Sequence, residues 1–191
     1  DDFLQFRPFH PGDLRRARFS KGLLAPKGLL YPVESVNPHP DLPAAVRDGI
    51  RSTVTRMLRI PLPYMGVWGI RTLAKAMRAW PARIGEPKAR SWLANVIRMQ
   101  EEIGTGGAGF RFMYAAFLDE AATMLGMPAL GELSEQLTEV GDQWREFGVR
   151  GARVVRATEN AAGDFEPLAE MLLDCAAREQ RIFETLRRAI G

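Results

Sequence analysis

A glycine-rich run near the middle of the chain, together with two side chains that follow it, could contact a ligand. The run Gly104-Thr105-Gly106-Gly107-Ala108-Gly109 has the G-x-G-x-x-G spacing of a dinucleotide cradle. In such a cradle the glycines let the backbone approach a pyrophosphate at the start of a helix. The guanidinium of Arg111 and the hydroxyl of Tyr114 follow this run. The candidate ligand-binding residues are therefore Gly104, Thr105, Gly106, Gly107, Arg111 and Tyr114.

The sequence around the glycines excludes a nucleotide site. A dinucleotide fingerprint requires a β-strand before its first glycine, whereas residues 91–104, "SWLANVIRMQEEIG", have a helical pattern. A P-loop is also excluded, because no Gly-Lys-Ser/Thr follows. Two hypotheses remain open. The glycines could form a helix-to-helix corner that serves packing alone, which we favour. They could instead present the next helix N-terminus, with Arg111 and Thr105, to a small anion.

No catalytic set can be assembled from the remaining residues. Cys175 is the single cysteine and lies on the apolar stripe of the last helical segment. A buried structural cysteine is expected there, since no histidine can be placed beside it. His10 and His39 are flanked by proline-containing irregular sequence. The sequence thus predicts no catalytic residue, no metal site and no cofactor, and a single cysteine fits a reducing, cytoplasmic setting.

Helices must position these residues, because the apolar periodicity from residue 41 onward is helical. Asp41 and Asp164 are predicted N-caps, and Gly104 and Gly126 are predicted to end helices. Tyr114 falls on an apolar stripe, so we expect a core residue with a bonded hydroxyl. One helix is expected to stop near residues 80–81, and two glycines are expected to interrupt a later one. The clearest stripe comprises Phe110, Met113, Tyr114, Phe117, Leu118, Ala121, Met124 and Leu125, and the interrupting glycines are Gly148 and Gly151.

The predicted fold class is all-α, a bundle of about six helices joined by short connections. Residues 1–40 differ from the rest, because they hold six of the 13 prolines and no long helical pattern. We expect a short strand in "FLQFRPF", residues 3–9, a short helix capped by Asp13, and then a proline-rich linker. The predicted domains are residues 1–40, a remnant strand and linker, and residues 41–191, the helical domain.

Charge is divided unevenly along the chain. Residues 41–100 hold 11 Lys/Arg and 3 Asp/Glu, a net +8, and residues 101–150 hold 3 and 9, a net −6. Oppositely charged helices could be neighbours, or residues 41–100 could offer a basic face to an acidic partner. Nucleic acid is not expected, because the basic residues alternate with core residues. The longest apolar run, residues 60–70, is too short to span a membrane, so no membrane partner is expected.

Three segments resemble one protein family. Residues 60–81, "IPLPYMGVWGIRTLAKAMRAWP", and residues 99–122, "MQEEIGTGGAGFRFMYAAFLDEAA", are similar to the C-terminal helical region of butirosin biosynthesis protein H-like proteins. That region is a domain of unknown function. The matched features are P-x-P-x-x-G-x-x-G-I at Pro61–Ile70 and the glycine run leading to Phe110-Arg111. Residues 13–27, "DLRRARFSKGLLAPK", resemble the exit from the family's first domain.

The resemblance implies a function as well as a fold. In that family the helical region follows a papain-like domain, and a cysteine thioester carries an acyl group from an acyl carrier protein to an aminoglycoside. It implies that residues 1–9, "DDFLQFRPF", are the last strand of an upstream domain that would supply the nucleophile. Neither Cys175 nor His10 matches the family's catalytic motifs. The implied partners are an acidic acyl carrier protein and a small-molecule acceptor. A second copy of the chain is a further expected partner. Two alternatives stay open: a stand-alone module for a small anionic ligand, and a structural or dimerisation domain.

Overall fold

The computed structural model describes residues 10–22, 25–36, 38–60, 62–102, 106–157 and 164–191. Its regular elements are helices, which confirms the all-α prediction for this part of the chain. The chain divides into two compact units, residues 1–40 and 41–191. The helices are α1 (Pro11–Arg18), α2 (Leu42–Leu58), α3 (Gly66–Ile84), α4 (Glu86–Glu101), the 3-10 turn η1 (Ala108–Phe110), α5 (Arg111–Leu125), α6 (Pro128–Arg156) and α7 (Phe165–Ile190).

The first unit contains α1 and an extended segment. The helix begins earlier than predicted: His10, and not Asp13, is its N-cap, and its Nδ1 accepts a hydrogen bond from the Gly12 N–H at 3.1 Å. Residues 25–36 contain no helix or strand. The strand expected at residues 3–9 lies outside the described residues.

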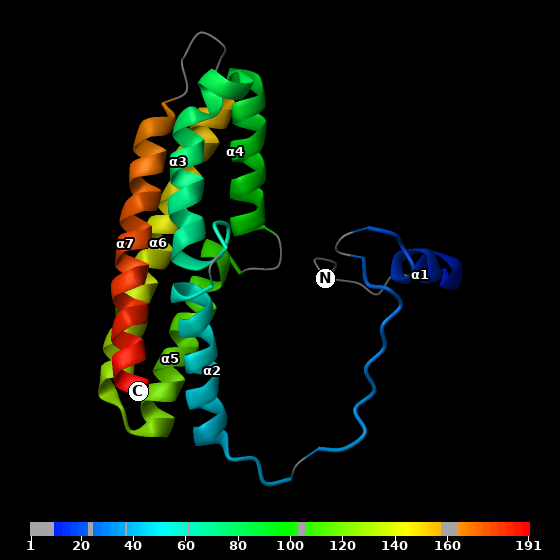
Figure 1. Ribbon diagram of the computed structural model, residues 1–191, viewed down its shortest axis with the longest axis vertical. Helices are drawn as coiled ribbons and strands as arrows, with labels where there is room; N and C mark the ends of the chain where they lie inside the picture. Colours follow the sequence, from blue (N-terminus) through cyan, green and yellow to red (C-terminus); the bar gives the residue numbers. More distant parts are fainter. Residues whose placement is uncertain (1–9, 23–24, 37, 61, 103–105, 158–163) are drawn as a thin grey trace. The chain divides into compact units, whose positions relative to one another are not determined.

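The second unit is built on two long helices. α6 has 29 residues and α7 has 26, and the two pack against each other. At one end α3 packs on α7 and α4 packs on α6, and at the other end α2 packs on α7 and α5 packs on α6 (Figure 1). The domain is therefore an elongated bundle of four columns. Two columns are continuous, and the other two, α2–α3 and α4–α5, are each interrupted.

Local sequence explains where most of these helices begin and end. The Asp41 carboxylate accepts a hydrogen bond from the Ala44 N–H at 3.0 Å, and Asp164 accepts one from the Glu166 N–H at 3.1 Å. Both predicted N-caps are thus confirmed. Gly126 ends α5 in the left-handed conformation, as predicted. Inward stripes on α3, α6 and α7 supply much of the core, which includes Met77, Leu137, Phe147, Leu172 and Leu186.

Three expected helix interruptions are wrong. α3 continues through Pro81 for a last turn and ends at Gly85, where φ is +80°. α6 continues through Gly148 and Gly151 to residue 156. A Cβ on Gly151 would lie 2.8 Å from Ile97 Cδ1, and one on Gly148 would lie 3.5 Å from the Glu101 side chain. Both glycines therefore allow α4 to approach α6 closely, so they serve packing and do not break the helix.

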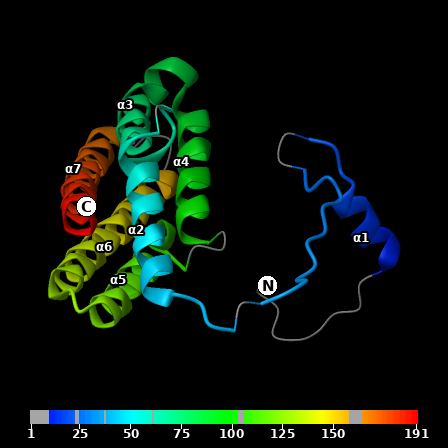
Figure 2. The ribbon, with the colours of Figure 1, turned by 60° about the horizontal axis from the view of Figure 1, so that its bottom comes forward.

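Both interrupted columns break at the same level of the bundle. The helix ends on either side of the α2–α3 break, Leu58 and Gly66, and of the α4–α5 break, Glu101 and Arg111, lie near the middle of α6 and α7. The two views of the ribbon agree on this arrangement of the helices (Figures 1 and 2). A helix end leaves backbone N–H and C=O groups without intrahelical partners. The middle of the bundle therefore needs side chains that satisfy these groups, and it has space that continuous helices would fill.

Candidate functional site

A groove of about 730 Å³ lies between α3 and α4, at the level of the two breaks. Its volume is within the range of small-molecule sites. Trp80 and Trp92 form one part of its wall, with their rings in an edge-to-face contact at 5.5 Å. Gly109, from the α4–α5 break, and Arg111, the first residue of α5, line it as well. Most of the other lining side chains are apolar, among them Ile70, Leu73, Ala76, Val96, Met99 and Trp144.

Residues 106–110 form a left-handed turn beside this groove. Gly106, Gly107, Ala108, Gly109 and Phe110 all have positive φ, from +50° to +87°. Glycine adopts this conformation at no steric cost, whereas each non-glycine residue pays about 1–2 kcal/mol. Ala108 is fully buried, so packing must hold it in this conformation. The turn ends at Arg111, whose backbone N–H donates to the Ala108 carbonyl.

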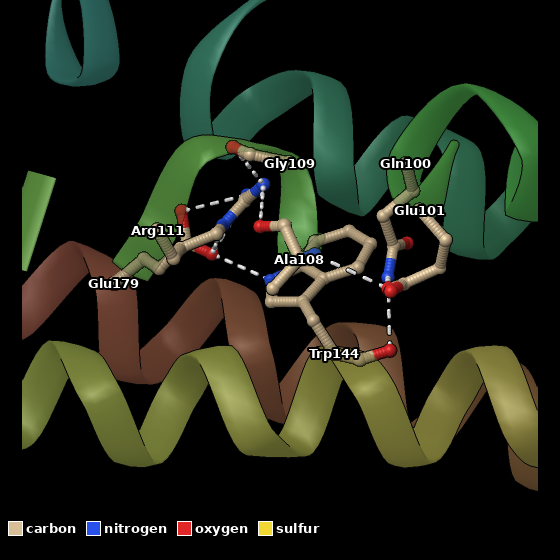
Figure 3. Close-up of polar contacts among 7 residues, drawn as sticks. All are labelled: Gln100, Glu101, Ala108, Gly109, Arg111, Trp144 and Glu179. Atoms are coloured by element: carbon tan, nitrogen blue, oxygen red, sulfur yellow. Dashed lines mark hydrogen bonds and ion pairs between the residues drawn. The ribbon is translucent and has the colours of Figure 1, made fainter. Parts of the chain in front are cut away.

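Arg111 joins this turn to both long helices. Its Nε and Nη2 donate to the two carboxylate oxygens of Glu179, at 2.9 and 3.1 Å, and its Nη1 lies 3.3 and 3.2 Å from the carbonyl oxygens of Ala108 and Gly109. The guanidinium also lies 4.3 Å from the centre of the Trp144 ring. Trp144 Nε1 donates to Glu179 at 2.8 Å (Figure 3). Glu179 is 1% exposed, so its charge depends on these partners.

The side chains of Gln100 and Glu101 make the hydrogen bonds on the opposite side of the break. Gln100 Nε2 donates to the Trp144 carbonyl and to a Glu101 carboxylate oxygen, both at 2.9 Å, and that oxygen also accepts from the Ala108 N–H at 3.2 Å (Figure 3). The last turn of α4, the left-handed turn and α6 are thus linked by one polar network. This network fixes the shape of the groove wall.

Among the predicted ligand-binding residues that the structure describes, Arg111 and Tyr114 line one cavity, whereas Gly106 and Gly107 do not line it. Gly104 and Thr105 lie outside the described residues. Gly106 is exposed and Gly107 is buried. The donors of Arg111 face Glu179 and two carbonyls, so an anion at this corner would compete with a buried carboxylate for the guanidinium. Anion binding by these residues stays a prediction.

Tyr114 lies on α5, with its ring packed among other aromatic side chains. Its ring stacks against Phe117 at 5.6 Å and Phe183 at 6.0 Å, as predicted for the apolar stripe. Its hydroxyl is buried, and its hydrogen-bond partner is the Thr53 side chain, at less than ideal geometry. Burial raises the pKa of Tyr114 to about 12, and the nearby Thr53 hydroxyl lowers it in part.

Sequence reasoning does not identify the residues that hold this site together. The sequence predicts helix packing alone for Trp144, and it does not single out Glu179 or Gln100. A signal for Glu179 exists, because it lies on the stripe of α7 that contains Cys175 and Ile182. A carboxylate at an apolar stripe position indicates a buried partner.

Cys175 lies one turn from Glu179 and is fully buried. Burial raises the pKa of its thiol from 9.0 to about 12, and the neighbouring Glu179 carboxylate acts in the same direction while Arg111 opposes it. The folded state therefore favours the neutral thiol. Stability from this group is complete below pH 9.0 and declines as the pH rises toward 12. A nucleophilic role requires the thiolate, so burial disfavours that role for Cys175.

We expect Cys175 to resist a thiol reagent in the native protein. A rise of about three pKa units lowers the thiolate fraction roughly a thousandfold at pH 8. Labelling by 5,5′-dithiobis(2-nitrobenzoate), followed by absorbance, should be slow in buffer and complete within seconds in 6 M guanidinium chloride. Rapid labelling of the folded chain at pH 8 would contradict this assignment.

Across the part of the chain that the structure describes, no three Cys, His, Asp or Glu side chains gather in a way that could hold a metal ion. None of the described helices is long and apolar enough to cross a membrane.

Comparison with known proteins gives a family and no characterised relative. No similar protein was found among curated proteins or among solved structures. A family described as "Domain of unknown function (DUF4872)" matches residues 12–186, which is most of the chain and includes the groove, the left-handed turn and the Arg111–Glu179 pair. The chain therefore belongs to the DUF4872 family.

Proposed function

We propose that residues 41–191 form a binding module for a long, mainly apolar chain such as an acyl group. The observation that carries this proposal is the groove of about 730 Å³ with its wall of tryptophan and aliphatic side chains. Small-molecule sites have this size and composition. Large apolar side chains at its edge remain accessible, since Tyr64 is 71% exposed, Met99 66% and Trp92 40%. Accessible apolar surface of this kind marks ligand or partner sites.

The polar groups of the groove favour an uncharged ligand segment. Gln100 is bonded to the Trp144 carbonyl and to Glu101, and Arg111 is bonded to Glu179. A charged ligand group in the groove would have to displace one of these buried contacts. An alkyl chain displaces none of them and gains about 25 cal/mol for each Å² of apolar surface that it buries.

The activity that this module would serve is cysteine-dependent acyl transfer, as the resemblance to butirosin biosynthesis protein H-like proteins implies. In this proposal the groove holds the acyl part of the substrate while a nucleophile outside residues 41–191 carries out the transfer to an amine acceptor. Cys175 does not act as the nucleophile in this proposal, because its thiol is buried and neutral.

An acidic acyl carrier protein is the proposed donor. Residues 41–100 carry a net +8. A basic surface would steer an acidic partner toward the groove. Exposed basic residues of this segment are Arg51, Arg56, Arg59, Lys75, Arg78, Arg83, Lys88 and Arg98.

Acyl binding can be measured by tryptophan fluorescence, because Trp80, Trp92 and Trp144 line the groove. Acyl thioesters of N-acetylcysteamine with 4 to 16 carbons would be titrated into the full chain. We expect affinity to rise with chain length, because each methylene adds about 0.8 kcal/mol when it is buried. Ala76→Leu, which fills the groove, should weaken binding at least tenfold. Lys75→Leu, on the exposed side of the same helix, is the matched control.

Two results would overturn the proposal. One is an affinity independent of chain length, and the other is equal binding by wild type and Ala76→Leu. Sedimentation velocity tests whether the groove instead contacts a second copy of the chain. A dimer that Ala76→Leu dissociates would support the dimerisation alternative in place of acyl binding.

A further inference from the structure

We call the groove between α3 and α4 the acyl groove, and a pair of tryptophans stands at one of its ends. On α3 its lining residues run from Gly66 to Trp80, and on α4 they run from Trp92 to Gln100. None of residues 81–91, all of which the structure describes, lines the groove. Trp80 and Trp92 are therefore the last wall residues in this direction.

The connection between α3 and α4 brings the two helices together at this end. α3 ends at Ile84 and α4 begins at Glu86, so a single residue, Gly85, joins them, and the two helices lie side by side (Figure 1). The Trp80 and Trp92 rings meet edge to face, with their centres 5.5 Å apart. Rings at this spacing are in direct contact, so they leave no passage for a ligand chain between them.

Packing holds the two rings to different degrees. Trp80 is 7% exposed, and its ring also meets the Phe165 ring edge to face at 6.5 Å. Trp92 is 40% exposed, and the Lys88 ammonium lies 5.8 Å from the centre of its ring. Trp80 is thus part of the core, whereas Trp92 can be replaced at a smaller cost in stability, because less of its surface is buried.

The other end of the acyl groove is open to solvent. Tyr64, in the α2–α3 break, is 71% exposed, and Met99, in the last turn of α4, is 66% exposed. Both residues line the groove. A chain that enters between them meets a wall of mainly apolar side chains and then the Trp80–Trp92 pair.

The wall between the two ends has a definite length. Gly69 and Trp80 both line the groove and are eleven positions apart on α3. A helix rises about 1.5 Å per residue, so this wall is about 16 Å long. A fully extended chain advances at most about 3.6 Å over three bonds, so an alkyl chain of about 12–14 carbons spans the same distance.

We propose that the acyl groove selects straight acyl chains of about 12–14 carbons and that Trp92 sets this limit. The inference rests on the proposed function, since it assigns an acyl chain to the groove. The thioester lies near Tyr64 and Met99, where a nucleophile outside residues 41–191 can reach it, and the methyl end lies against the tryptophan pair. A longer chain leaves its last carbons in water or displaces the Trp92 ring, so the gain in affinity with each methylene stops there.

Isothermal titration calorimetry of the full chain with acyl thioesters of N-acetylcysteamine tests this limit. The acyl chains have 8, 10, 12, 14, 16 and 18 carbons, and the heat signal does not depend on how many tryptophans a variant contains. For the wild type we expect affinity to rise about threefold to fourfold with each buried methylene. Beyond the limit, two further methylenes should change the affinity less than about twofold.

Two variants move the end wall in opposite directions. Trp92→Ala should bind the 18-carbon thioester at least fivefold more tightly than the wild type does and the 10-carbon thioester no more tightly. Val96→Phe places a ring one turn nearer the open end. It should bind the 14-carbon thioester at least tenfold more weakly and the 8-carbon thioester with affinity within about twofold of the wild type. Trp68→Ala is the matched control, because Trp68 is 51% exposed and does not line the acyl groove, and it should leave the limit unchanged.

The chain-length limit and the acyl groove can fail separately. Wild-type affinity that is independent of chain length would overturn both. Affinity that rises with chain length but reaches the same limit in the wild type and in Trp92→Ala would overturn the role of Trp92 and leave the acyl groove in place. Equally weakened binding of every chain length by Trp92→Ala would do the same, since loss of packing alone acts on all lengths alike. Whatever the stability of Trp92→Ala, an unchanged ratio of 14-carbon to 8-carbon affinity in Val96→Phe, or a rise that continues to 18 carbons in the wild type, would overturn the limit.

Discussion

Glu179→Gln should lower the free energy of unfolding by about 3–5 kcal/mol, because it breaks a buried ion pair from one side. Glu179 is 1% exposed and accepts hydrogen bonds from Arg111 and from Trp144 Nε1. The side-chain amide of the variant cannot accept from all of these donors and carries no charge. The Arg111 guanidinium would therefore lose its counterion in a place where the Arg111 side chain is 17% exposed. Urea unfolding followed by circular dichroism at neutral pH measures the loss.

The exposed pair Arg178–Glu139 is the matched control, since it also joins α7 to α6. Glu139 is 67% exposed, so Glu139→Gln should cost about 0–1 kcal/mol. The double variant Arg111→Met/Glu179→Leu should lose less free energy of unfolding than Glu179→Gln, because it leaves no unpaired charge. A loss below about 1 kcal/mol for Glu179→Gln would contradict the structural role of the pair.

Gly66→Ala should cost about 2–5 kcal/mol, from the sum of two effects. Gly66 has φ of +55°, which costs an alanine about 1–2 kcal/mol. Its Cβ would also lie 2.4 Å from the Met57 carbonyl oxygen and 2.8 Å from that of Arg56. Overpacking typically costs about 1–3 kcal/mol, and here the obstacle is backbone, which cannot rotate away. The α2–α3 junction would have to open.

The comparison for this variant is Gly131→Ala, inside α6. Its Cβ would meet Ala122 Cβ at 3.9 Å, an ordinary contact, and φ at Gly131 is not positive. Alanine is about 1 kcal/mol better than glycine in a helix, so this variant should be neutral or stabilising. Because Gly66 also lines the acyl groove, Gly66→Ala should weaken acyl thioester binding even where the domain stays folded. Equal stability of Gly66→Ala and Gly131→Ala in urea would contradict the expected clash between the new Cβ and the end of α2.

One feature of the architecture explains why the acyl groove reaches the middle of the bundle. α6 and α7 are continuous, while the columns beside them are interrupted at the same level, so the middle of the bundle lacks packed helix on two of its four columns. The left-handed turn occupies part of this space, and one end of the acyl groove reaches it.

The amino-acid sequence by itself determined the helices and many of their ends. Apolar residues at spacings of three and four, the N-caps Asp41 and Asp164, and the C-terminal glycine Gly126 act over a few residues, so they can be recognised without a fold. The exclusion of a dinucleotide cradle at the glycine run also depended on local context alone, because no strand precedes it.

Tertiary structure alone decided what the same residues do at the site. Gly148 and Gly151 look like helix breakers in the sequence, and they become packing positions because α4 presses against them. Arg111 looks like an anion-binding cation, and it becomes half of a buried pair because Glu179 stands opposite it. Residues 111 and 179 are 68 positions apart. A contact of that separation leaves no local pattern in the sequence, since its energy arises only when packing brings two distant helices together and excludes water between them.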